Sequence, residues 1–584
     1  MIYPEIPLAQ TVVQLCKSKK IKHIIISPGS RNAPLTIGFT NDNYFKCYSI
    51  VDERCAAFFA LGIAQQLKEP TAVVCTSGSA LLNYYPAVAE AFYSNIPLVV
   101  LSADRPKHLI GIGDGQTIYQ QDVFKNHILY SANLKLDLKD EDAIPDDNEL
   151  PIIKNLENKF ERLLGLQKDI QSFNEDEINN AINVSLIKKG PVHINIPFNE
   201  PLYNTVEKLV VSPEVIDILV NPFEIENLES YLNDWNSATK KMILVGVNYP
   251  NEIDRKWLDK ISEDDSVIVF TETTSNLHHP SFFPSIDQII APLTEAEEKE
   301  LQPDILLTFG GMVVSKKIKS LLRKHQPKQH WHVDEKIAND TFFCLKHHIK
   351  ATPNEFFTAF LSKVSTHNSS SFKSQWTAIK NSRLQKHNDY INQIPHSDFS
   401  VFNVMLKSIP RNYIMQVGNS SAIRYTQLFN IDSSLEVFCN RGTSGIDGST
   451  STAIGCAVAN SKPTVLITGD LSFLYDSNAL WNNYIPRNFR IIVVNNQGGG
   501  IFRILPGHKN TMNFDTYFET KHNYNSEQLC NMFGLNYESA KDASTLKSTI
   551  KLFFQESKKP KLLEIFTPKD INDEVLLNYF EYLK

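Results

Sequence analysis

Short apolar runs rich in β-branched residues alternate with stretches of helical periodicity along most of the chain. Such runs are typical of strands in parallel sheets, because helices cover both faces of a parallel sheet. The pattern separates into three blocks, at residues 1–205, 206–379 and 380–584. The sequence therefore predicts an α/β protein with three doubly wound parallel-sheet domains.

The expected strands define the three blocks. They lie at residues 23–27, 72–76 and 97–104, then at 242–247, 266–272, 305–310 and 330–334, and finally at 413–418, 436–440, 464–470, 490–496 and 562–566. A basic helix is expected at 316–325, a solvated acidic insertion at 137–149 and a serine-rich linker at 365–371. The first and third blocks could share one fold, since polar and glycine residues follow the strand ends in both, where ligands bind open α/β sheets.

Composition excludes several classes of protein. The chain has 584 residues, too many for one hydrophobic core, and its net charge of −7 gives no general attraction to nucleic acid or to an acidic membrane. No signal peptide is evident, and no apolar run reaches the ~18 residues of a membrane helix. Eight scattered cysteines without a CxxC pair indicate reduced thiols in a cytoplasmic protein. Cys344, His347 and His348 are expected in a surface loop rather than at a metal.

The most specific pattern lies in the third block. Asp470 stands at the end of one predicted strand, and Asn496 stands at the end of the next, 26 positions later. Neighbouring strand ends can bring a carboxylate and an amide oxygen onto one hard cation, to which Gly498 can add its carbonyl. The cation would bridge the oxygens of a diphosphate. The competing interpretation is that Asp470 only caps a helix and Asn496 only forms a turn.

Several motifs then carry a family resemblance. Gly469-Asp470 followed by Asn495-Asn496 resembles the thiamine diphosphate motif, with Leu471 where glycine is usual. Together with NNQGGGIFRILP it resembles the 2-succinyl-5-enolpyruvyl-6-hydroxy-3-cyclohexene-1-carboxylate synthases of menaquinone biosynthesis. Further matching motifs extend the resemblance over nearly the whole chain, at residues 27–35, 76–91, 101–106, 113–120, 418–424 and 440–448.

The resemblance implies an activity and an assembly. The cofactors would be thiamine diphosphate and Mg²⁺ or Mn²⁺. The enzyme would decarboxylate 2-oxoglutarate and add the product in a 1,4 manner to isochorismate. The assembly would be a homodimer or homotetramer with its active site at a subunit interface, without nucleic-acid or membrane partners.

Cofactor-binding roles are likewise implied by the resemblance. Glu53, in VDER, would activate the cofactor, although an isolated glutamate at this place would be interpreted first as a first-turn acid of a helix. The other implied residues are Asp470, Asn496 and Gly498 at the metal, Ser420 at the diphosphate, Ile446 under the bent cofactor, and Ile501, Phe502 and Leu505 as an apolar wall.

Four carboxylates on the two implied substrates require several cations, preferably arginines that bind carboxylates through two hydrogen bonds. By resemblance, Arg31, Arg105, Arg424 and Arg441 contact these carboxylates, and Gln116 reaches the reacting intermediate. Lys316 and Lys317 match a basic pair of the middle domain, with lysine replacing arginine at one position. Gly115 stands where some relatives have an amide.

Three alternatives stay open at this point. An acetolactate-synthase-like or simple 2-oxo-acid decarboxylase would use the same cofactor on small monocarboxylates, which need fewer arginines. A nicotinamide dehydrogenase is disfavoured, because no GxGxxG opens a helix after a strand. A non-catalytic anion- or nucleic-acid-binding protein rests on residues 316–325 alone, and one basic helix face in an acidic chain is usually solvated.

Overall fold

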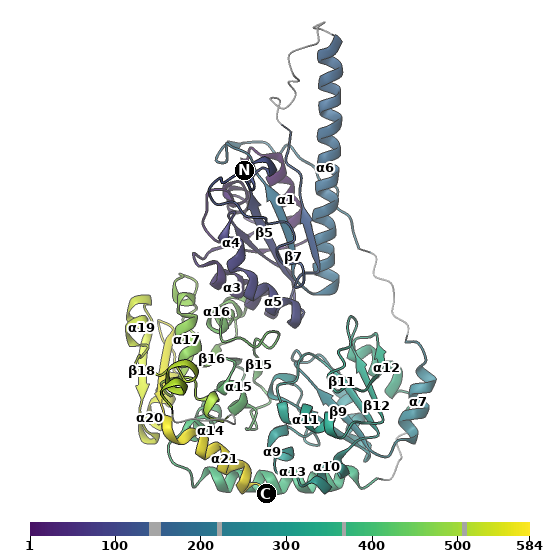
Figure 1. The fold of residues 1–584 in the computed structure, drawn as a ribbon, viewed down its shortest axis with the longest axis vertical. Helices are drawn as coiled ribbons and strands as arrows, with labels where there is room; N and C mark the ends of the chain where they lie inside the picture. The colour runs from purple at the N-terminus through teal and green to yellow at the C-terminus, as the bar shows by residue number, and fades with distance from the viewer. Residues whose placement is uncertain (139–153, 219–224, 365–369, 505–510) are drawn as a thin grey trace. The chain divides into compact units, whose positions relative to one another are not determined.

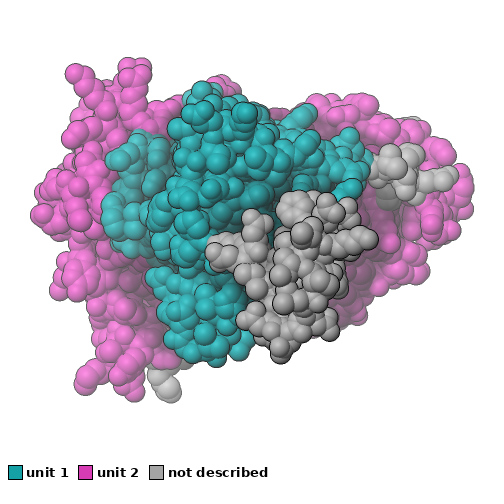
Figure 2. Space-filling view, turned by 90° about the horizontal axis from the view of Figure 1, so that it is seen from above, with its two compact units in different colours: residues 1–220, 450–461, 476–485 teal, residues 221–449, 462–475, 486–584 magenta. Residues whose placement is uncertain are grey.

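The computed structural model describes residues 1–138, 154–218, 225–364, 370–504 and 511–584 (Figure 1). The chain forms two compact units (Figure 2). The first unit contains residues 1–220, 450–461 and 476–485, and the second contains residues 221–449, 462–475 and 486–584. Two segments of the last third of the chain therefore belong to the first unit.

The first unit is built on a six-stranded parallel sheet in the order β3-β2-β4-β5-β7-β6. Its strands are β2 (His23–Ile26), β3 (Lys46–Ser49), β4 (Thr71–Cys75), β5 (Leu98–Asp104), β6 (Tyr130–Asn133) and β7 (Val192–Pro197), and β1 (Tyr3–Pro4) pairs separately with β8 (Thr205–Val206). Its helices are α1 (Pro7–Ser18), α2 (Ala33–Thr40), α3 (Glu53–Leu67), α4 (Ser79–Asn83), α5 (Tyr85–Ser94) and α6 (Lys154–Lys188).

Helices cover both faces of this sheet. Alternate strand residues such as Ile24, Val74 and Val99 form one buried cluster with α1, α2 and α6. Helix α3 contacts β2 and β4 and packs on α5. This two-sided burial explains the nearly continuous apolar runs of the central strands.

Two segments from the last third of the chain also belong to this unit. They are α16 (Ser449–Ala459), from residue 450 onward, and the short helix η4 (Ser477–Leu480). The backbones of α3 and α16 touch: a Cβ on Gly62 would lie 2.1 Å from the Thr452 carbonyl oxygen, and one on Gly455 would lie 2.0 Å from the Phe59 carbonyl oxygen. Glycine is required at both positions by this close approach.

The second unit contains two parallel sheets. The five-stranded sheet has the order β10-β9-β11-β12-β13, and the six-stranded sheet has the order β15-β14-β16-β17-β19-β18. The strands of the first are β9 (Lys241–Val245), β10 (Val267–Thr271), β11 (Ile305–Phe309), β12 (Gln329–Val333) and β13 (Leu345–Ile349). Those of the second are β14 (Ile414–Val417), β15 (Glu436–Phe438), β16 (Thr464–Gly469), β17 (Arg490–Asn495), β18 (Asn536–Ala540) and β19 (Lys561–Phe566).

Helices again cover these sheets. One face of the five-stranded sheet packs against α7 (Leu228–Ser237), α8 (Arg255–Glu263) and α12 (Pro353–Leu361). The other face packs against α9 (Ile286–Ile290), α10 (Glu295–Leu301), α11 (Lys316–Lys324) and α13 (Phe372–Ile391). The main cluster of the six-stranded sheet contains α14 (Asp398–Ser408), α15 (Ser421–Thr426), α20 (Ala543–Phe553) and α21 (Asn572–Tyr582). The remaining helices are α17 (Asp470–Tyr475), α18 (Ile501–Ile504) and α19 (Glu527–Phe533).

The predicted α/β fold class is confirmed. The two six-stranded sheets share one strand order, as the similar strand ends of the first and third blocks suggested. The order reverses between β2 and β4 and between β14 and β16, which are the positions where open α/β sheets bind ligands. The boundaries at 205/206 and 379/380 stay predictions.

Two local expectations need correction, and a third lies mostly outside the described residues. Asp137, expected in a solvated insertion, instead accepts a hydrogen bond from the Leu8 backbone N–H (2.9 Å), and residues 139–149 lie outside the described residues. His347 and His348, expected in a surface loop, instead lie in the edge strand β13. The predicted linker lies mostly outside the described residues, and α13 begins just after it at Phe372. Among the described helices, none is long and apolar enough to span a bilayer.

Candidate active site

A polar pocket of about 290 Å³ lies in the first unit, where β2 and β4 end. Two residues predicted from the sequence, Glu53 and Gln116, line it together. The other lining residues come from the turns after β2 and β4: Pro28, Gly29, Ser30, Thr76, Ser77, Ser79 and Ala80. The pocket thus occupies the switch point of the first sheet, the expected place for a ligand.

Glu53 is the first residue of α3, and the preceding Asp52 caps the helix by accepting from the Cys55 backbone N–H at 3.1 Å. The Glu53 carboxylate accepts a long hydrogen bond from the Asn83 amide (3.5 Å). Glu53 is partly exposed on the pocket wall. It is therefore both a first-turn acid and a group available to a ligand in the pocket.

Arg105 fixes the loop that carries Gln116. Its Nη1 donates to the Gln116 carbonyl oxygen (2.8 Å) and to Ser77 Oγ (2.5 Å), and its Nε lies 3.4 Å from Asp114 Oδ2. Gln116 has a left-handed backbone (φ 56°), a strained conformation that is often found at functional sites. A Cβ on Gly115 would meet no atom within 4 Å, so this position faces open space.

Arg31 is the second cation of this unit. Its Nη1 donates to the Phe198 carbonyl oxygen (3.1 Å) and lies 3.2 Å from Glu200 Oε1. Its Nε is buried without a hydrogen-bond partner. Burial lowers the pKa of Arg31, with a further contribution from the nearby charge of Arg105. The positive charges of the two arginines therefore influence each other.

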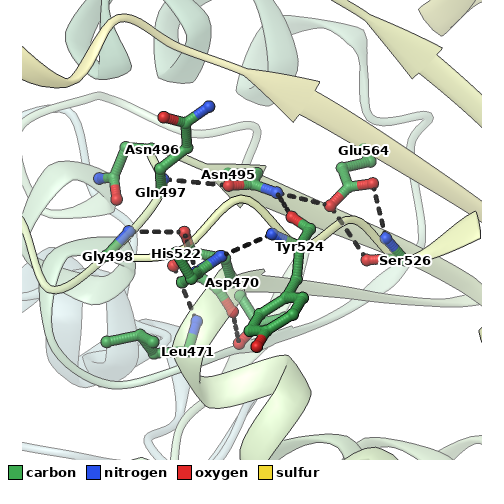
Figure 3. Close-up of polar contacts among 12 residues, drawn as sticks. Asp470, Leu471, Asn495, Asn496, Gln497, Gly498, His522, Tyr524, Ser526 and Glu564 are labelled. Carbon is green, nitrogen blue, oxygen red and sulfur yellow. Dashed lines mark hydrogen bonds and ion pairs between the residues drawn. The ribbon is translucent and has the colours of Figure 1, made fainter. Parts of the chain in front are cut away.

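In the second unit, Asp470 stands where β16 ends and α17 begins, and it is only 4% exposed. Its carboxylate accepts hydrogen bonds from the backbone N–H groups of Leu471 (2.7 Å) and Gly498 (3.0 Å), as Figure 3 shows. His522 Nε2 lies 3.2 Å from Asp470 Oδ2. Asp470 thus starts a helix, as the competing interpretation held, and also faces the loop after β17.

The two asparagines at the end of β17 differ sharply (Figure 3). Both polar atoms of the Asn495 side chain have hydrogen-bond partners. Its amide nitrogen donates to Glu564 (2.8 Å) and to the Tyr524 carbonyl oxygen (3.0 Å), and its oxygen accepts from the Gln497 N–H (3.0 Å). Asn496 donates to Asp398 (3.0 Å), but its Oδ1 is buried without a partner. A buried acceptor without a donor is costly unless a ligand satisfies it.

These residues fit a hard divalent cation with diphosphate. Strands β16 and β17 are parallel neighbours, as predicted, so Asp470 and Asn496 leave the same edge of the sheet. Within the described residues, no three His, Cys, Asp or Glu side chains gather as a metal site. One carboxylate and one amide oxygen suit Mg²⁺, which usually keeps waters and binds phosphate oxygens as well. The Gly498 carbonyl accepts from the Gly500 N–H (3.1 Å).

Residues near Asp470 and Asn496 went unnoticed in the sequence. Asp398, at the start of α14, and His522 contact Asn496 and Asp470 from distant positions, and no motif marked either one. Burial raises the pKa of Asp398 to about 6. His522 Nδ1 accepts from the Tyr524 N–H (3.1 Å), so in the neutral ring the proton is on Nε2, beside Asp470.

The remaining cofactor candidates lie in loops or at the start of a helix in the second unit. Ser420 precedes α15 with a backbone conformation (φ 67°, ψ −128°) that is rare for a residue with a side chain. Ile446 exposes 38% of its surface, and its carbonyl accepts from Ser472 Oγ (2.7 Å). Ile501 and Phe502 begin α18, and Phe502 is 37% exposed. Leu505 lies outside the described residues.

Arg424 and Arg441 form the cationic pair of the second unit. Arg441 Nη1 donates to Asn419 Oδ1 (2.7 Å), and its Nε is buried without a partner. Burial and the charge of Arg441 both lower the pKa of Arg424, whereas Asp287 opposes the shift. Like the arginines of the first unit, these two interact electrostatically.

Two buried acids next to the five-stranded sheet, Glu272 and Asp287, interact electrostatically with this pair of arginines. Burial raises the pKa of Glu272 to about 7, although its carboxylate accepts from the Val314 and Ser315 N–H groups, both at 2.7 Å. These bonds anchor the start of α11. The ammonium of Lys317 lies 4.7 Å from the centre of the Phe580 ring.

Lys319 was missed by the sequence interpretation, although it lies in the same basic helix as the predicted pair. Its half-buried side chain interacts electrostatically with Glu272, Arg441 and Lys316. The placement of Lys316 and Lys317 at substrate stays a prediction.

Family models and related proteins both match this chain. A model of the N-terminal TPP (thiamine pyrophosphate) binding domain of thiamine pyrophosphate enzymes matches residues 6–129, and the C-terminal TPP binding domain model matches residues 416–565. A 2-succinyl-5-enolpyruvyl-6-hydroxy-3-cyclohexene-1-carboxylate synthase of Flavobacterium psychrophilum is 55% identical over all of both chains. The chain belongs to this synthase family. Synthases of Christiangramia forsetii (55%, all of both chains) and Porphyromonas gingivalis (35%, 98% of this chain and 96% of the other) are also similar.

The family assignment confirms the resemblance seen in the motifs. The N-terminal domain match includes the pocket with Glu53 and Gln116, and the C-terminal match includes Asp470 and Asn496. The two cofactor-binding domain models therefore match the two parts of this chain that contain the candidate residues. The roles of the individual residues stay predictions.

Proposed function

We propose that this chain decarboxylates 2-oxoglutarate and adds the resulting four-carbon unit to isochorismate, giving 2-succinyl-5-enolpyruvyl-6-hydroxy-3-cyclohexene-1-carboxylate and CO₂. The observation that carries the proposal is the end-to-end similarity to synthases of that name, at 55% identity. The four half-buried or buried arginines support it, because the two substrates bring four carboxylates.

Asp470 and Asn496 would hold Mg²⁺ or Mn²⁺, with Gly498 nearby, and the cation would hold the diphosphate of the cofactor. Ser420 would contact the diphosphate, and Ile446, Ile501 and Phe502 would supply apolar contacts. Bound thiamine diphosphate supplies the nucleophilic carbon and the electron sink for decarboxylation. The buried, unpartnered Asn496 oxygen supports this assignment.

The side chains of the protein bind, orient and transfer protons. Glu53 would exchange a proton at its carboxyl oxygen with the cofactor, and the Gln116 amide would contact the reacting part of the substrate. Arg31 with Arg105, and Arg424 with Arg441, would each bind carboxylates through paired N–H groups. Two cations per anion offset the cost of removing a dicarboxylate from water.

The proposal extends to the basic pair, the assembly and the location. Lys316 and Lys317 would strengthen the positive field for the substrates. The enzyme would be a homodimer or homotetramer whose sites are completed by two subunits. A cytoplasmic location is supported by eight cysteines, all in described residues, that form no disulfide. An active monomer in sedimentation would overturn the assembly.

The decisive experiment incubates purified protein with thiamine diphosphate, Mg²⁺ and 2-oxoglutarate, with and without isochorismate. Mass spectrometry should detect the adduct only when both substrates are present, with one CO₂ released per adduct. Pyruvate replaces 2-oxoglutarate in a parallel reaction. Faster CO₂ release from pyruvate would reject the proposal in favour of a decarboxylase or acetolactate-type enzyme.

A further inference from the structure

Asp398 contacts the proposed metal ligand Asn496 from a different part of the sequence. It is the first residue of α14 and is 3% exposed. One carboxylate oxygen accepts from Asn496 Nδ2 (3.0 Å), and the other accepts from Thr567 Oγ1 (2.6 Å). Its backbone N–H donates to Asn572 Oδ1 (2.8 Å). Both the side chain and the backbone of Asp398 are therefore fixed.

A side-chain amide has two ends of similar shape and opposite polarity. Rotation by half a turn exchanges a carbonyl oxygen, which binds a cation, for an NH₂ group, which repels it. An ionised carboxylate only accepts hydrogen bonds, so it holds the NH₂ end and excludes the rotated state. In this protein the opposite end of the same amide is the buried, unpartnered Asn496 Oδ1.

We propose that Asp398 is a positioning residue, which holds the Asn496 amide with its oxygen turned toward the divalent cation. The inference rests on the proposed function, because it takes Asn496 as a metal ligand. Asp398 does not itself contact the cation in this assignment. Partners of this kind typically change metal affinity by about 10–100-fold when they are removed.

The structure offers a matched control. Thr567 donates to the other oxygen of the same carboxylate, so Thr567→Val removes one hydrogen bond of Asp398 but leaves its contact with Asn496. Asp398→Leu removes the acceptor with little change in volume. Asp398→Asn loses the charge but keeps a carbonyl oxygen that can face Asn496. An asparagine can also form hydrogen bonds with the buried polar neighbours, which a leucine would leave without a partner.

The test measures Mn²⁺ binding by electron paramagnetic resonance on the full chain with thiamine diphosphate. Asp398→Leu should weaken Mn²⁺ binding by about 10–100-fold, Asp398→Asn should weaken it less, and Thr567→Val should stay within about threefold of wild type. Thermal unfolding without metal checks that each variant folds. If the leucine variant is unfolded, Asp398→Asn is compared with Thr567→Val: weaker Mn²⁺ binding in Asp398→Asn supports the role of Asp398, and equal binding in the two variants overturns it.

An Asn496→Asp background separates orientation from charge. A carboxylate at position 496 has two equivalent oxygens and needs no orientation, so replacing Asp398 should no longer weaken Mn²⁺ binding there. Equal loss in both backgrounds, a loss in Asp398→Asn as large as in the leucine variant, or no loss in any variant would overturn the role of Asp398. Failure of wild type to bind Mn²⁺ with the cofactor would instead overturn the metal site and this inference together.

Discussion

Replacing Gly62 by alanine tests the contact between α3, which begins with Glu53, and α16. The new Cβ would lie 2.1 Å from the Thr452 carbonyl oxygen and 2.9 Å from the Cys456 nitrogen, against 3.4 Å or more in ordinary contact. Both are backbone atoms, so the helices must separate by about 1 Å rather than a side chain turning aside. Overpacking costs about 1–3 kcal/mol, and a clash with backbone atoms belongs to the upper part of this range, about 2–3 kcal/mol. Alanine gains about 1 kcal/mol of helix propensity over glycine. We expect a net loss of about 1–2 kcal/mol.

Hydrogen-exchange mass spectrometry of α3 and α16 measures this loss locally. A loss of this size should lower amide protection in both helices by about 5–30-fold. Gly38→Ala in α2 is the matched control, because its Cβ would meet chiefly a methyl group of Val13 at 2.8 Å, which can rotate away. Unchanged protection in Gly62→Ala would refute the backbone contact between α3 and α16.

Three further predictions concern the site. Glu53→Gln should bind thiamine diphosphate normally but lose about 10²–10⁴ in turnover, and retained turnover would remove Glu53 from the mechanism. Arg441→Met should lower kcat/KM about 10–100-fold through the loss of charge-assisted hydrogen bonds, whereas the exposed Arg411→Met should not; equal effects would contradict the assignment. The pKa of Glu272 is about 7 in the folded protein and 4.5 in the unfolded chain, so the folded state binds the proton more tightly. The free energy of unfolding should therefore fall by about 3 kcal/mol as the pH rises from 4.5 to 7. A Glu272→Gln variant should lack this pH dependence in urea unfolding, and an unchanged pH profile would contradict the shift.

The central strands could be predicted from the sequence, and several outer strands could not. Strands such as β16 and β17 are buried on both faces and appear as continuous apolar runs. The edge strands β3, β6, β13 and β18 are partly exposed and carry polar residues, so their runs are too weak to recognise. Strand β7 is buried, but His193 and Asn195 interrupt its apolar run. These two polar side chains are tolerated because both hydrogen-bond to Ser102 in the core.

The candidate site shows the same division. Strand-end spacing predicted that Asp470 and Asn496 would leave adjacent strands, and the structure confirms the pairing of β16 with β17. The sequence could not show that the Asn495 amide donates a hydrogen bond to Glu564 while the Asn496 oxygen has no partner, because these contacts depend on side-chain rotation. Asp398 lies 98 residues before Asn496 and belongs to no motif, so only the folded chain reveals their contact.

The most direct test of the account titrates thiamine diphosphate into metal-free protein by calorimetry, with and without Mg²⁺. We expect binding that depends on Mg²⁺ in the wild type and is abolished in Asp470→Ala, since that variant loses the carboxylate proposed to bind the cation. Equal affinity with and without Mg²⁺, or an Asp470→Ala variant that binds like wild type, would contradict the assignment of Asp470 and Asn496.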